Sequence, residues 1–276
     1  FFFVKTNYDI QKCRIRGKIQ KKVYPGDIAV INLEDEIVEE VKDRDNLLMR
    51  PKVANVEQVI LLQSLLKPSI DRKLLDRFIL MVESSELKPI IAFNKIDLVD
   101  NLQELKEDLS IYSKIGYDVF YISAKKHLGL DELYHQLENN INVIAGPSGS
   151  GKSTLINSIV EDVQLPTNEV SKKLQRGKHT TKHVELITLS SKGYVADTPG
   201  FSRLNIENID SSDLKYYFPE FQNYEGKCKF STCSHTHEPG CKVKEALEKG
   251  LISERRYESY QEIYKELQEK EDDIYG

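Results

Sequence analysis

The sequence predicts an α/β fold with a mostly parallel sheet, preceded by a small β-barrel of the OB kind and followed by a helical metal-binding region. Apolar stretches of strand length alternate with stretches of helical periodicity between residues 59 and 145. Ahead of them, charged and apolar residues alternate in short segments separated by turns. Behind them, three of the four cysteines lie between Cys228 and Cys241. These patterns divide the chain into three regions.

The composition is that of a globular protein in water. Its 276 residues leave room for two or three domains, and 39% of them are hydrophobic and 30% charged. No apolar run approaches the roughly 20 residues that a membrane helix needs, so we expect no membrane partner. The net charge of -5 does not indicate a nucleic-acid-binding protein, although basic residues are locally concentrated. Clustered cysteines favour a reducing cytoplasm and a metal over disulfides.

The first region, residues 1–50, reads as the OB-like barrel. Residues 12–19 mostly alternate between basic and apolar side chains, which predicts a strand with one basic face. Further strands are expected at residues 28–33 and 37–41, after a turn at 25–27. Such a face binds nucleic acid in many OB-type barrels, or it is simply solvated. The basic face consists of Lys12, Arg14, Arg16 and Lys18.

The second region, residues 51–209, is expected to contain the parallel sheet. Residues 43–56 read as a linker into it. Because ligand loops lie at the carboxyl ends of parallel strands, the residues that follow each strand are the candidates for binding. The expected strands are 59–66, 89–93, 119–122 and 141–145, and the expected helices lie around 74–82, 102–115 and 130–137.

A glycine-rich loop follows the strand at 141–145 and precedes a helical stretch, which is the context of a phosphate-binding P-loop. Its backbone N–H groups would surround the phosphates, Lys152 would bridge the β- and γ-phosphates, and the Ser153 hydroxyl would coordinate Mg²⁺. The alternative is a chance glycine-rich turn. The loop consists of Gly146, Pro147, Ser148, Gly149, Ser150, Gly151, Lys152, Ser153 and Thr154.

Two further loops at strand ends predict guanine recognition. The Asp97 carboxylate can accept hydrogen bonds from guanine N1–H and N2–H₂, a donor pair that adenine lacks. Asn94 can bond the other edge of the base, the Lys95 stem can cover its face, and the Ala124 N–H can donate to guanine O6. Each motif alone is weak evidence, but together with a P-loop the two motifs strongly indicate a guanine-nucleotide site. The motifs are Asn94-Lys95-Ile96-Asp97 and Ser123-Ala124-Lys125.

Switch loops are expected after the P-loop helix. Residues 171–183 contain no acid, and two strands follow, at 184–189 and 193–196. Asp197, at the end of the second strand, would hold Mg²⁺ through a water, and the Gly200 N–H would contact the γ-phosphate. Thr181 is preferred over Thr180 as the hydroxyl that reaches Mg²⁺ in the triphosphate state, because a basic residue follows it.

The third region, residues 210–276, contains a metal-ligand pattern. Three thiolates and an imidazole make a tetrahedral Zn²⁺ set with no open position, so one structural zinc is expected. His237 is an alternative ligand, and reduced cysteines in a small core are the alternative to any metal. The expected ligands are Cys228, Cys233, His235 and Cys241.

The base-binding motifs precede the P-loop, which is the order of a circularly permuted GTPase. With a basic barrel in front and the cysteine cluster behind, the chain resembles the ribosome small-subunit-dependent GTPase A family. The resemblance implies hydrolysis of GTP to GDP and phosphate, with Mg²⁺, in late maturation of the 30S subunit and under stimulation by it. It also selects His235 as the zinc ligand. The matching segments are residues 25–27, 94–97, 123–125, 146–154, 176–181, 197–201 and the cysteine cluster.

Two functions remain open from the sequence. The first is a monomeric, cytoplasmic GTPase that binds 16S rRNA. The second is a zinc-containing RNA-binding protein that uses the nucleotide as a conformational lock. Phe201 supports the second because it stands where Ras-type GTPases place a water-orienting Gln, which leaves His179 or His183 as candidate catalytic groups or as ordinary loop histidines. The expected RNA contacts are Lys12, Arg14, Arg16, Lys18, Arg176 and Lys178.

Overall fold

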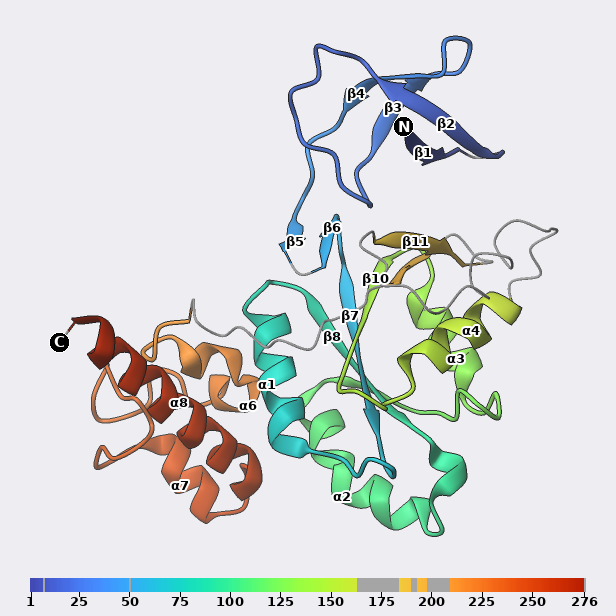
Figure 1. Ribbon diagram of the computed structural model, residues 1–276. Helices are drawn as coiled ribbons and strands as arrows, with labels where there is room; N and C mark the ends of the chain where they lie inside the picture. Colours follow the sequence, from blue (N-terminus) through green and yellow to red (C-terminus); the bar gives the residue numbers. More distant parts are fainter. Residues whose placement is uncertain (7, 50, 163–183, 190–192, 198–208, 276) are drawn as a thin grey trace. The chain divides into compact units, whose positions relative to one another are not determined.

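The computed structural model describes the chain except for residues 7, 50, 163–183, 190–192, 198–208 and 276 (Figure 1). It divides into two compact units, which are described separately. The first comprises residues 1–58, 135–144 and 159–201, and the second comprises residues 59–134, 145–158 and 202–276.

The N-terminal part of the first unit is a four-stranded sheet around a core that contains Cys13, Val38 and Val41. The outer pairs are antiparallel and the central pair, β2 with β4, is parallel. The first strand was not expected from the sequence. Closure of this sheet into an OB barrel stays a prediction. The strand order is β1 (Phe2–Lys5), β2 (Ile10–Ile15), β4 (Ile37–Val41) and β3 (Ala29–Asn32).

The alternation in β2 follows the predicted pattern, although the strand is shorter than expected. Lys12 and Arg14 are exposed, whereas Cys13 between them is buried. The strand ends at Ile15, so Lys18 lies beyond it on an exposed turn. The predicted single basic strand face is therefore correct for its first half only.

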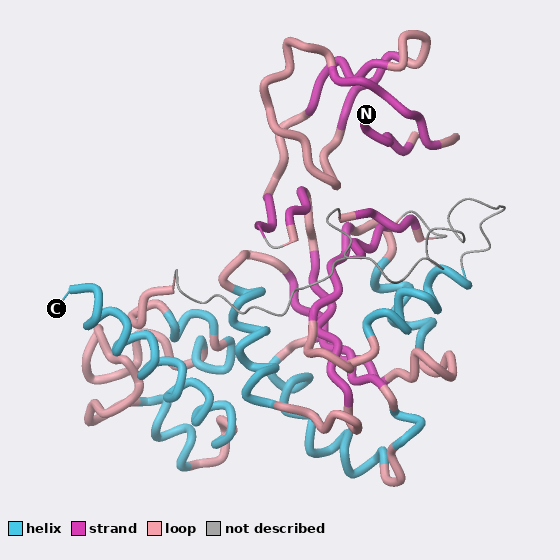
Figure 2. Tube along the Cα trace, viewed as in Figure 1, coloured by secondary structure: helices cyan, strands magenta, loops and turns pink. Residues whose placement is uncertain are grey.

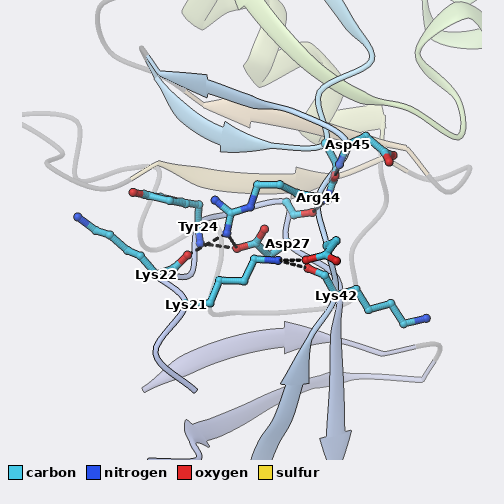
Figure 3. Close-up of polar contacts among 10 residues, drawn as sticks. Lys21, Lys22, Tyr24, Asp27, Lys42, Arg44 and Asp45 are labelled. Atoms are coloured by element: carbon cyan, nitrogen blue, oxygen red, sulfur yellow. Dashed lines mark hydrogen bonds and ion pairs between the residues drawn. The ribbon is translucent and has the colours of Figure 1, made fainter. Parts of the chain in front are cut away.

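The predicted turn at residues 25–27 is anchored by a buried ion pair (Figure 3). The Asp27 carboxylate accepts hydrogen bonds from the Tyr24 backbone N–H at 2.8 Å and from Arg44 Nη2 at 3.0 Å. Arg44 Nη2 also donates to the Lys22 carbonyl at 2.9 Å. The Asp27 side chain is 1% exposed, so the guanidinium is its charge partner away from water.

The stretch at residues 43–56 is folded, so the prediction of a linker there was wrong. It forms a hairpin of β5 (Leu47–Met49) and β6 (Lys52–Ala54), with Pro51 between the two strands. The hairpin packs closely against the turn at residues 25–27. The approach is so close that a Cβ added at Gly26 would lie 2.1 Å from the Ala54 carbonyl oxygen. Short apolar pieces on either side of a proline gave no recognisable strand period.

The remaining strands form a six-stranded sheet that is mostly parallel where its pairing is described, as predicted. Strands β8 and β9 are parallel, as are β10 and β12, whereas β11 is antiparallel to β12. Every residue of β7 is buried, which explains its continuous apolar run. The order is β11 (Glu185–Thr188), β12 (Tyr194–Asp197), β10 (Ile141–Ala145), β7 (Gln58–Ser64), β8 (Lys88–Asn94) and β9 (Asp118–Tyr121).

Helices alternate with these strands along the chain, as Figure 2 shows. Asp71 caps helix α1 (Arg72–Glu83) by accepting a hydrogen bond from the Leu74 N–H, and Asn101 caps helix α2 (Leu102–Ile115) in the same way. Helix α1 packs on β8, and helix α2 packs on β9. A short 3-10 turn, η1 (Ile96–Leu98), follows β8. The helices are α1 (Arg72–Glu83), α2 (Leu102–Ile115), α3 (Leu130–Leu137) and α4 (Lys152–Asp162).

The C-terminal part of the second unit is a small helical lobe that packs on α1. Its core includes Leu80 of α1 together with aromatic side chains of the last helix, among them Tyr257 and Tyr260. Among the described helices none is long and apolar enough to cross a membrane. The elements are η2 (Leu214–Tyr217), α6 (Pro219–Gln222), α7 (Lys242–Glu248) and α8 (Glu254–Tyr275).

Candidate nucleotide and metal sites

One side-chain amide joins the three predicted nucleotide loops. Asn94, the last residue of β8, is 2% exposed, and its Nδ2 donates to the Ser150 carbonyl at 2.9 Å. Its Oδ1 accepts from the Lys95 N–H at 2.8 Å and from the Ala124 N–H at 3.0 Å. The loop at residues 94–97, which we call the base loop, the loop after β9 and the P-loop therefore meet at the carboxyl ends of the strands.

Asn94 and Ala124 are expected at the edges of a guanine base, and here each makes a hydrogen bond to protein. Their contact with a base stays a prediction. The Asn94 amide is 2% exposed, and its hydrogen bonds hold the loops together. Asn94 lies at the end of a buried strand, where its side chain can either contact a base or position the loops. Sequence spacing alone does not distinguish these two roles.

Lys95 adds a second connection between the loops. Its backbone is left-handed, with φ of 68°, which turns the chain immediately after β8. Its ammonium donates to the Gly149 carbonyl at 2.6 Å and also to the Lys67 carbonyl, which lies beyond the end of β7. The lysine stem thus lies across the space between the base loop and the P-loop, as its predicted covering of a base requires.

Asp97 is the exposed carboxylate of the base loop. Its Oδ1 accepts a hydrogen bond from the Ser123 hydroxyl at 2.5 Å, and Ser123 is fully buried. The hydroxyl also accepts from the Lys126 N–H at 3.1 Å, so its position is fixed from both sides. Orientation of an exposed carboxylate by a buried hydroxyl suits it to a donor pair on a ligand.

Glycine is required at two positions of the P-loop. Gly146 has φ of 147°, and a Cβ there would lie 2.1 Å from the Leu62 carbonyl oxygen. Gly151 has φ of 99°, and a Cβ there would lie 2.3 Å from Asn94 Nδ2. Both glycines therefore allow a backbone bend and a close approach that a side chain would strain.

The polar groups of the P-loop fit a phosphate ligand. Lys152 Nζ donates to the carbonyls of Gly146 and Pro147, at 2.7 and 2.8 Å, and burial lowers the pKa of this lysine. The Ser150 hydroxyl oxygen is buried with no hydrogen-bond partner among the described residues. A buried unpaired hydroxyl and a lysine folded onto its own loop are groups that an anion can satisfy, and Ser153 is exposed beside them.

Most of the predicted switch residues lie outside the described part of the chain. For Asp197 only the backbone is described, at the end of β12, where the sequence placed it. The other residues that lie outside the description are Arg176, Lys178, His179, Thr180, Thr181, His183, Gly200 and Phe201.

The predicted cysteine and histidine ligands form one cluster. One ligand atom from each of Cys228, Cys233, His235 and Cys241 lies within 4.8 Å of all the others. His235 Nδ1 is 3.6 Å from Cys228 Sγ and 3.4 Å from Cys241 Sγ. Three soft thiols and one imidazole at this separation fit a tetrahedral metal such as Zn²⁺. Burial lowers the pKa of His235, which favours the neutral ring that a ligand must have.

The alternative ligand His237 does not belong to the cluster. It is exposed, and its Nδ1 lies 2.9 Å from the Thr236 hydroxyl. His235 has a left-handed backbone, with φ of 62°, which turns its ring toward the cysteines. The structure therefore agrees with His235 as the fourth member of the group.

The loop at residues 234–238, which we call the metal loop, is held by the carboxylate of Glu238, which no sequence motif indicates. Glu238 accepts hydrogen bonds from the N–H and the hydroxyl of Ser234, both at 2.7 Å, and from the Thr236 and His237 N–H groups, both at 3.3 Å. Burial would raise the pKa of Glu238, but the bonds from Ser234 lower it to about 2. No spacing rule identifies such a carboxylate, because three of these four donors are backbone N–H groups.

A family model described as RsgA GTPase matches residues 41–207 of this chain. The match covers the hairpin β5–β6, all of the candidate nucleotide loops and the switch region. The metal loop lies outside it.

Curated relatives match over nearly the whole chain. A small ribosomal subunit biogenesis GTPase RsgA from Clostridium perfringens (strain 13 / Type A) is 42% identical, over 97% of this chain and 94% of its own length. The protein of the same name from Geobacillus kaustophilus is 44% identical, over 98% and 94%.

Solved structures agree with this similarity. YjeQ from Thermotoga maritima is 37% identical and has a TM-score of 0.79, covering 94% of this chain and 90% of its own. YloQ, described as a circularly permuted GTPase, is 34% identical with a TM-score of 0.79, covering 95% and 88%.

Proposed function

This chain belongs to the RsgA GTPase family and is a GTPase, and from that premise we propose that it acts in late maturation of the small ribosomal subunit. The relatives from Clostridium and Geobacillus are named for small-subunit biogenesis. The observation that supports the nucleotide site most directly is the bonding of Asn94 and Lys95 to the P-loop. GTP would be the substrate, and GDP and phosphate the products.

We assign phosphate binding to the P-loop, residues 146–154. On this assignment Lys152 exchanges its two loop carbonyls for the β- and γ-phosphates, and backbone N–H groups donate to the remaining oxygens. Mg²⁺ supplies charge neutralisation when bound, and Ser153, Thr181 and Asp197 would hold it. The Gly200 N–H would contact the γ-phosphate, and His179 is the candidate catalytic group for the water.

We assign guanine selection to residues 94–97 and 123–125. Asp97 accepts from guanine N1–H and N2–H₂, and Ser123 orients it. Asn94 acts mainly by positioning the loops, and the Lys95 stem covers the base. Ile96, Ala124 and Lys125 complete the proposed set of base-binding residues.

The metal is proposed to be one structural Zn²⁺, bound by Cys228, Cys233, His235 and Cys241, because all four positions of a tetrahedral ion would be filled by protein. The proposed domains are residues 1–50, 51–209 and 210–276. The sheet of β1 to β4, which ends at Val41, and the helical lobe, which starts at Leu214, support the outer two. A cytoplasmic monomer remains the proposed form of the protein.

Contacts with 16S rRNA are proposed for Lys12, Arg14, Arg16, Lys18, Arg176 and Lys178. The exposure of Lys12 and Arg14 on β2 supports the N-terminal part of this set. Arg16 lies 3.8 Å from Glu39 in an exposed pair, which an RNA phosphate can replace at little cost. Affinity for the subunit should fall steeply with salt, since each phosphate contact releases counterions.

Phosphate release from GTP, measured with and without purified small subunits, tests the proposal. Stimulation by small subunits but not by large subunits is the expected result, and Lys152→Ala should abolish release under both conditions. Turnover that subunits leave unchanged would favour the other function, an RNA-binding protein in which guanine nucleotide locks the conformation. Phe201 is the residue that keeps this second candidate in consideration.

A further inference from the structure

Helix α1 contains a buried carboxylate that the nucleotide site does not use. Asp76 is 1% exposed, in the middle of a helix that otherwise buries apolar side chains. Its Oδ1 accepts from Arg256 Nη1 at 2.7 Å and from the Tyr112 hydroxyl at 3.2 Å. Its Oδ2 accepts from the Ser259 hydroxyl at 2.6 Å. A charge buried this deeply is stable only while these partners stay in place.

Two of the three partners belong to α8. Arg256, which is 2% exposed, also donates from Nε to Glu220 at 2.8 Å and lies 4.6 Å from the centre of the Phe218 ring. Its guanidinium is therefore fixed between α1 and the start of α6. Loss of either carboxylate would leave the buried guanidinium with one charge partner in place of two, so both carboxylates stabilise its position.

The same turns of α8 hold the metal loop. The Tyr257 hydroxyl donates to the His235 carbonyl at 2.6 Å, and the Tyr260 hydroxyl donates to the Ser234 carbonyl at 2.5 Å. Because successive helical residues point about 100° apart, Arg256 and Ser259 face α1 while the tyrosines face the metal loop. A shift of this loop is therefore expected to move both Arg256, which neutralises Asp76, and Ser259, which donates a hydrogen bond to it.

The third partner of Asp76 leads toward the base loop. Tyr112 lies in α2, which follows that loop along the chain. The Tyr112 ring packs on Phe93, with 6.2 Å between ring centres, and Phe93 directly precedes Asn94. Asp76 thus contacts both the lobe that holds the metal loop and the side chain that supports the end of β8.

We propose that Asp76 is a positioning residue through which metal binding and guanine-nucleotide binding are thermodynamically linked. The inference rests on the proposed zinc and guanine-nucleotide sites. Metal bound at Cys228, Cys233, His235 and Cys241 fixes the metal loop and α8, and Asp76 and Tyr112 then hold the end of β8 in its binding position. Linkage is reciprocal, so GDP must raise the affinity for metal by the same factor as the metal raises the affinity for GDP.

The test uses the full chain, Zn²⁺ and a fluorescent GDP analogue. GDP affinity is measured with zinc bound and after its removal by a chelator, and zinc affinity is measured with and without GDP. A factor of about five or more, equal in both directions, is the expected result. Equal GDP affinity with and without zinc would overturn the inference.

Single-hydroxyl variants locate the route. Ser259→Ala and Tyr112→Phe each remove one hydrogen bond to Asp76. Both variants should still fold and bind zinc and GDP, so that both affinities can be measured. We expect the linkage factor to fall toward one in both. Ser113→Ala on α2 and Tyr264→Phe on α8 are matched controls, because among the described residues their hydroxyls bond within their own helices, and they should keep the parent factor.

The outcomes separate the two levels of the proposal. An undiminished factor in both Ser259→Ala and Tyr112→Phe would overturn the route through Asp76. A zinc-loaded parent chain that fails to bind the GDP analogue would instead disprove the proposed function, and the linkage with it. Binding of GDP and zinc with no linkage between them would disprove the inference alone.

Discussion

The nucleotide loops and the metal loop assemble in opposite ways. The nucleotide loops follow three strands that lie far apart in the sequence, and Asn94 and Lys95 join them by hydrogen bonds. The metal-binding cluster comes from one short segment, between Cys228 and Cys241, which has no strand within it. A parallel sheet with its own core supports the first site, whereas side chains of α8 and Glu238 support the second.

The difference teaches where each site obtains its geometry. Strand ends converge because the sheet forms, so the nucleotide loops are in place before any ligand arrives. The metal-binding cluster collects three thiols and a ring without regular structure of its own, so bound metal should contribute much of its stability. Removal of a ligand group should therefore affect folding in the lobe but mainly binding in the nucleotide site.

The largest effect is expected from loss of the metal. Cys233→Ser replaces a buried thiol, and the remaining three ligands cannot complete a tetrahedral site. Since structural zinc contributes on the order of 10 kcal/mol in small domains, we expect loss of the metal and a lower melting temperature together. Native mass spectrometry and thermal unfolding measure the two.

His237→Ala is the matched control for the metal site. His237 is exposed and lies outside the cluster, so this variant should keep one metal per chain and the parent melting temperature. Full metal content in Cys233→Ser, or its loss in His237→Ala, would contradict the assigned ligands.

A smaller effect, limited to binding, is expected for Lys152→Ala. The variant lacks the ammonium that donates to the Gly146 and Pro147 carbonyls here and that is proposed to bind phosphate, so GTP affinity should fall about 100-fold, or about 3 kcal/mol. Lys88→Ala, which breaks an exposed pair with Asp118, should leave affinity unchanged. A titration with a fluorescent GTP analogue measures the affinity of both variants. An unfolded Lys152→Ala protein would contradict the expectation that this substitution affects binding and not folding.

Selectivity is expected to change next, in Asp97→Asn. The amide keeps the shape but cannot accept from both guanine donors, so the preference for GTP over ATP should shrink by about tenfold to a hundredfold. Asp100→Asn, at a nearby exposed carboxylate, is the control and should retain the preference. An unaltered ratio of GTP to ATP affinity in Asp97→Asn would mean that another group reads the base.

The smallest effect is expected at the contact between the P-loop and the base loop. Gly151→Ala places a Cβ against Asn94 Nδ2 at a backbone angle that disfavours alanine, which should cost about 1–2 kcal/mol. Both nucleotide affinity and the free energy of unfolding should decline. Gly17→Ala is the control, since a Cβ there has no neighbour within 4 Å. Denaturant unfolding with and without GDP separates the two contributions.

Much of the fold was predictable from the sequence. Strands at Ile37–Val41 and Ile141–Ala145 and helices at Leu102–Ile115 and Leu130–Leu137 have the expected bounds, because their apolar period or run is bounded by strong turn and cap residues. The cysteine cluster was predictable for a different reason. Its members lie close in sequence, so their spacing already limits where their side chains meet.

The unpredicted parts depend on contacts between distant residues. Strand β1 is continuous with an aromatic run that has no alternation, and the hairpin β5–β6 is interrupted by Pro51. Asp76 reads as a polar position on an amphipathic helix, and only Arg256, 180 positions later, makes it a buried one. Asn94 likewise reads as a base contact until the P-loop backbone is placed against it.

The order of the loops along the chain has a consequence for synthesis. The residues proposed to select the base, 94–97 and 123–125, are synthesised before the P-loop at residues 146–154. Domains form from their N-terminal end during translation, so strands β7, β8 and β9 can pair while the phosphate-binding half is still being synthesised. Nucleotide can therefore join the nascent protein only after the selective half of its site has emerged.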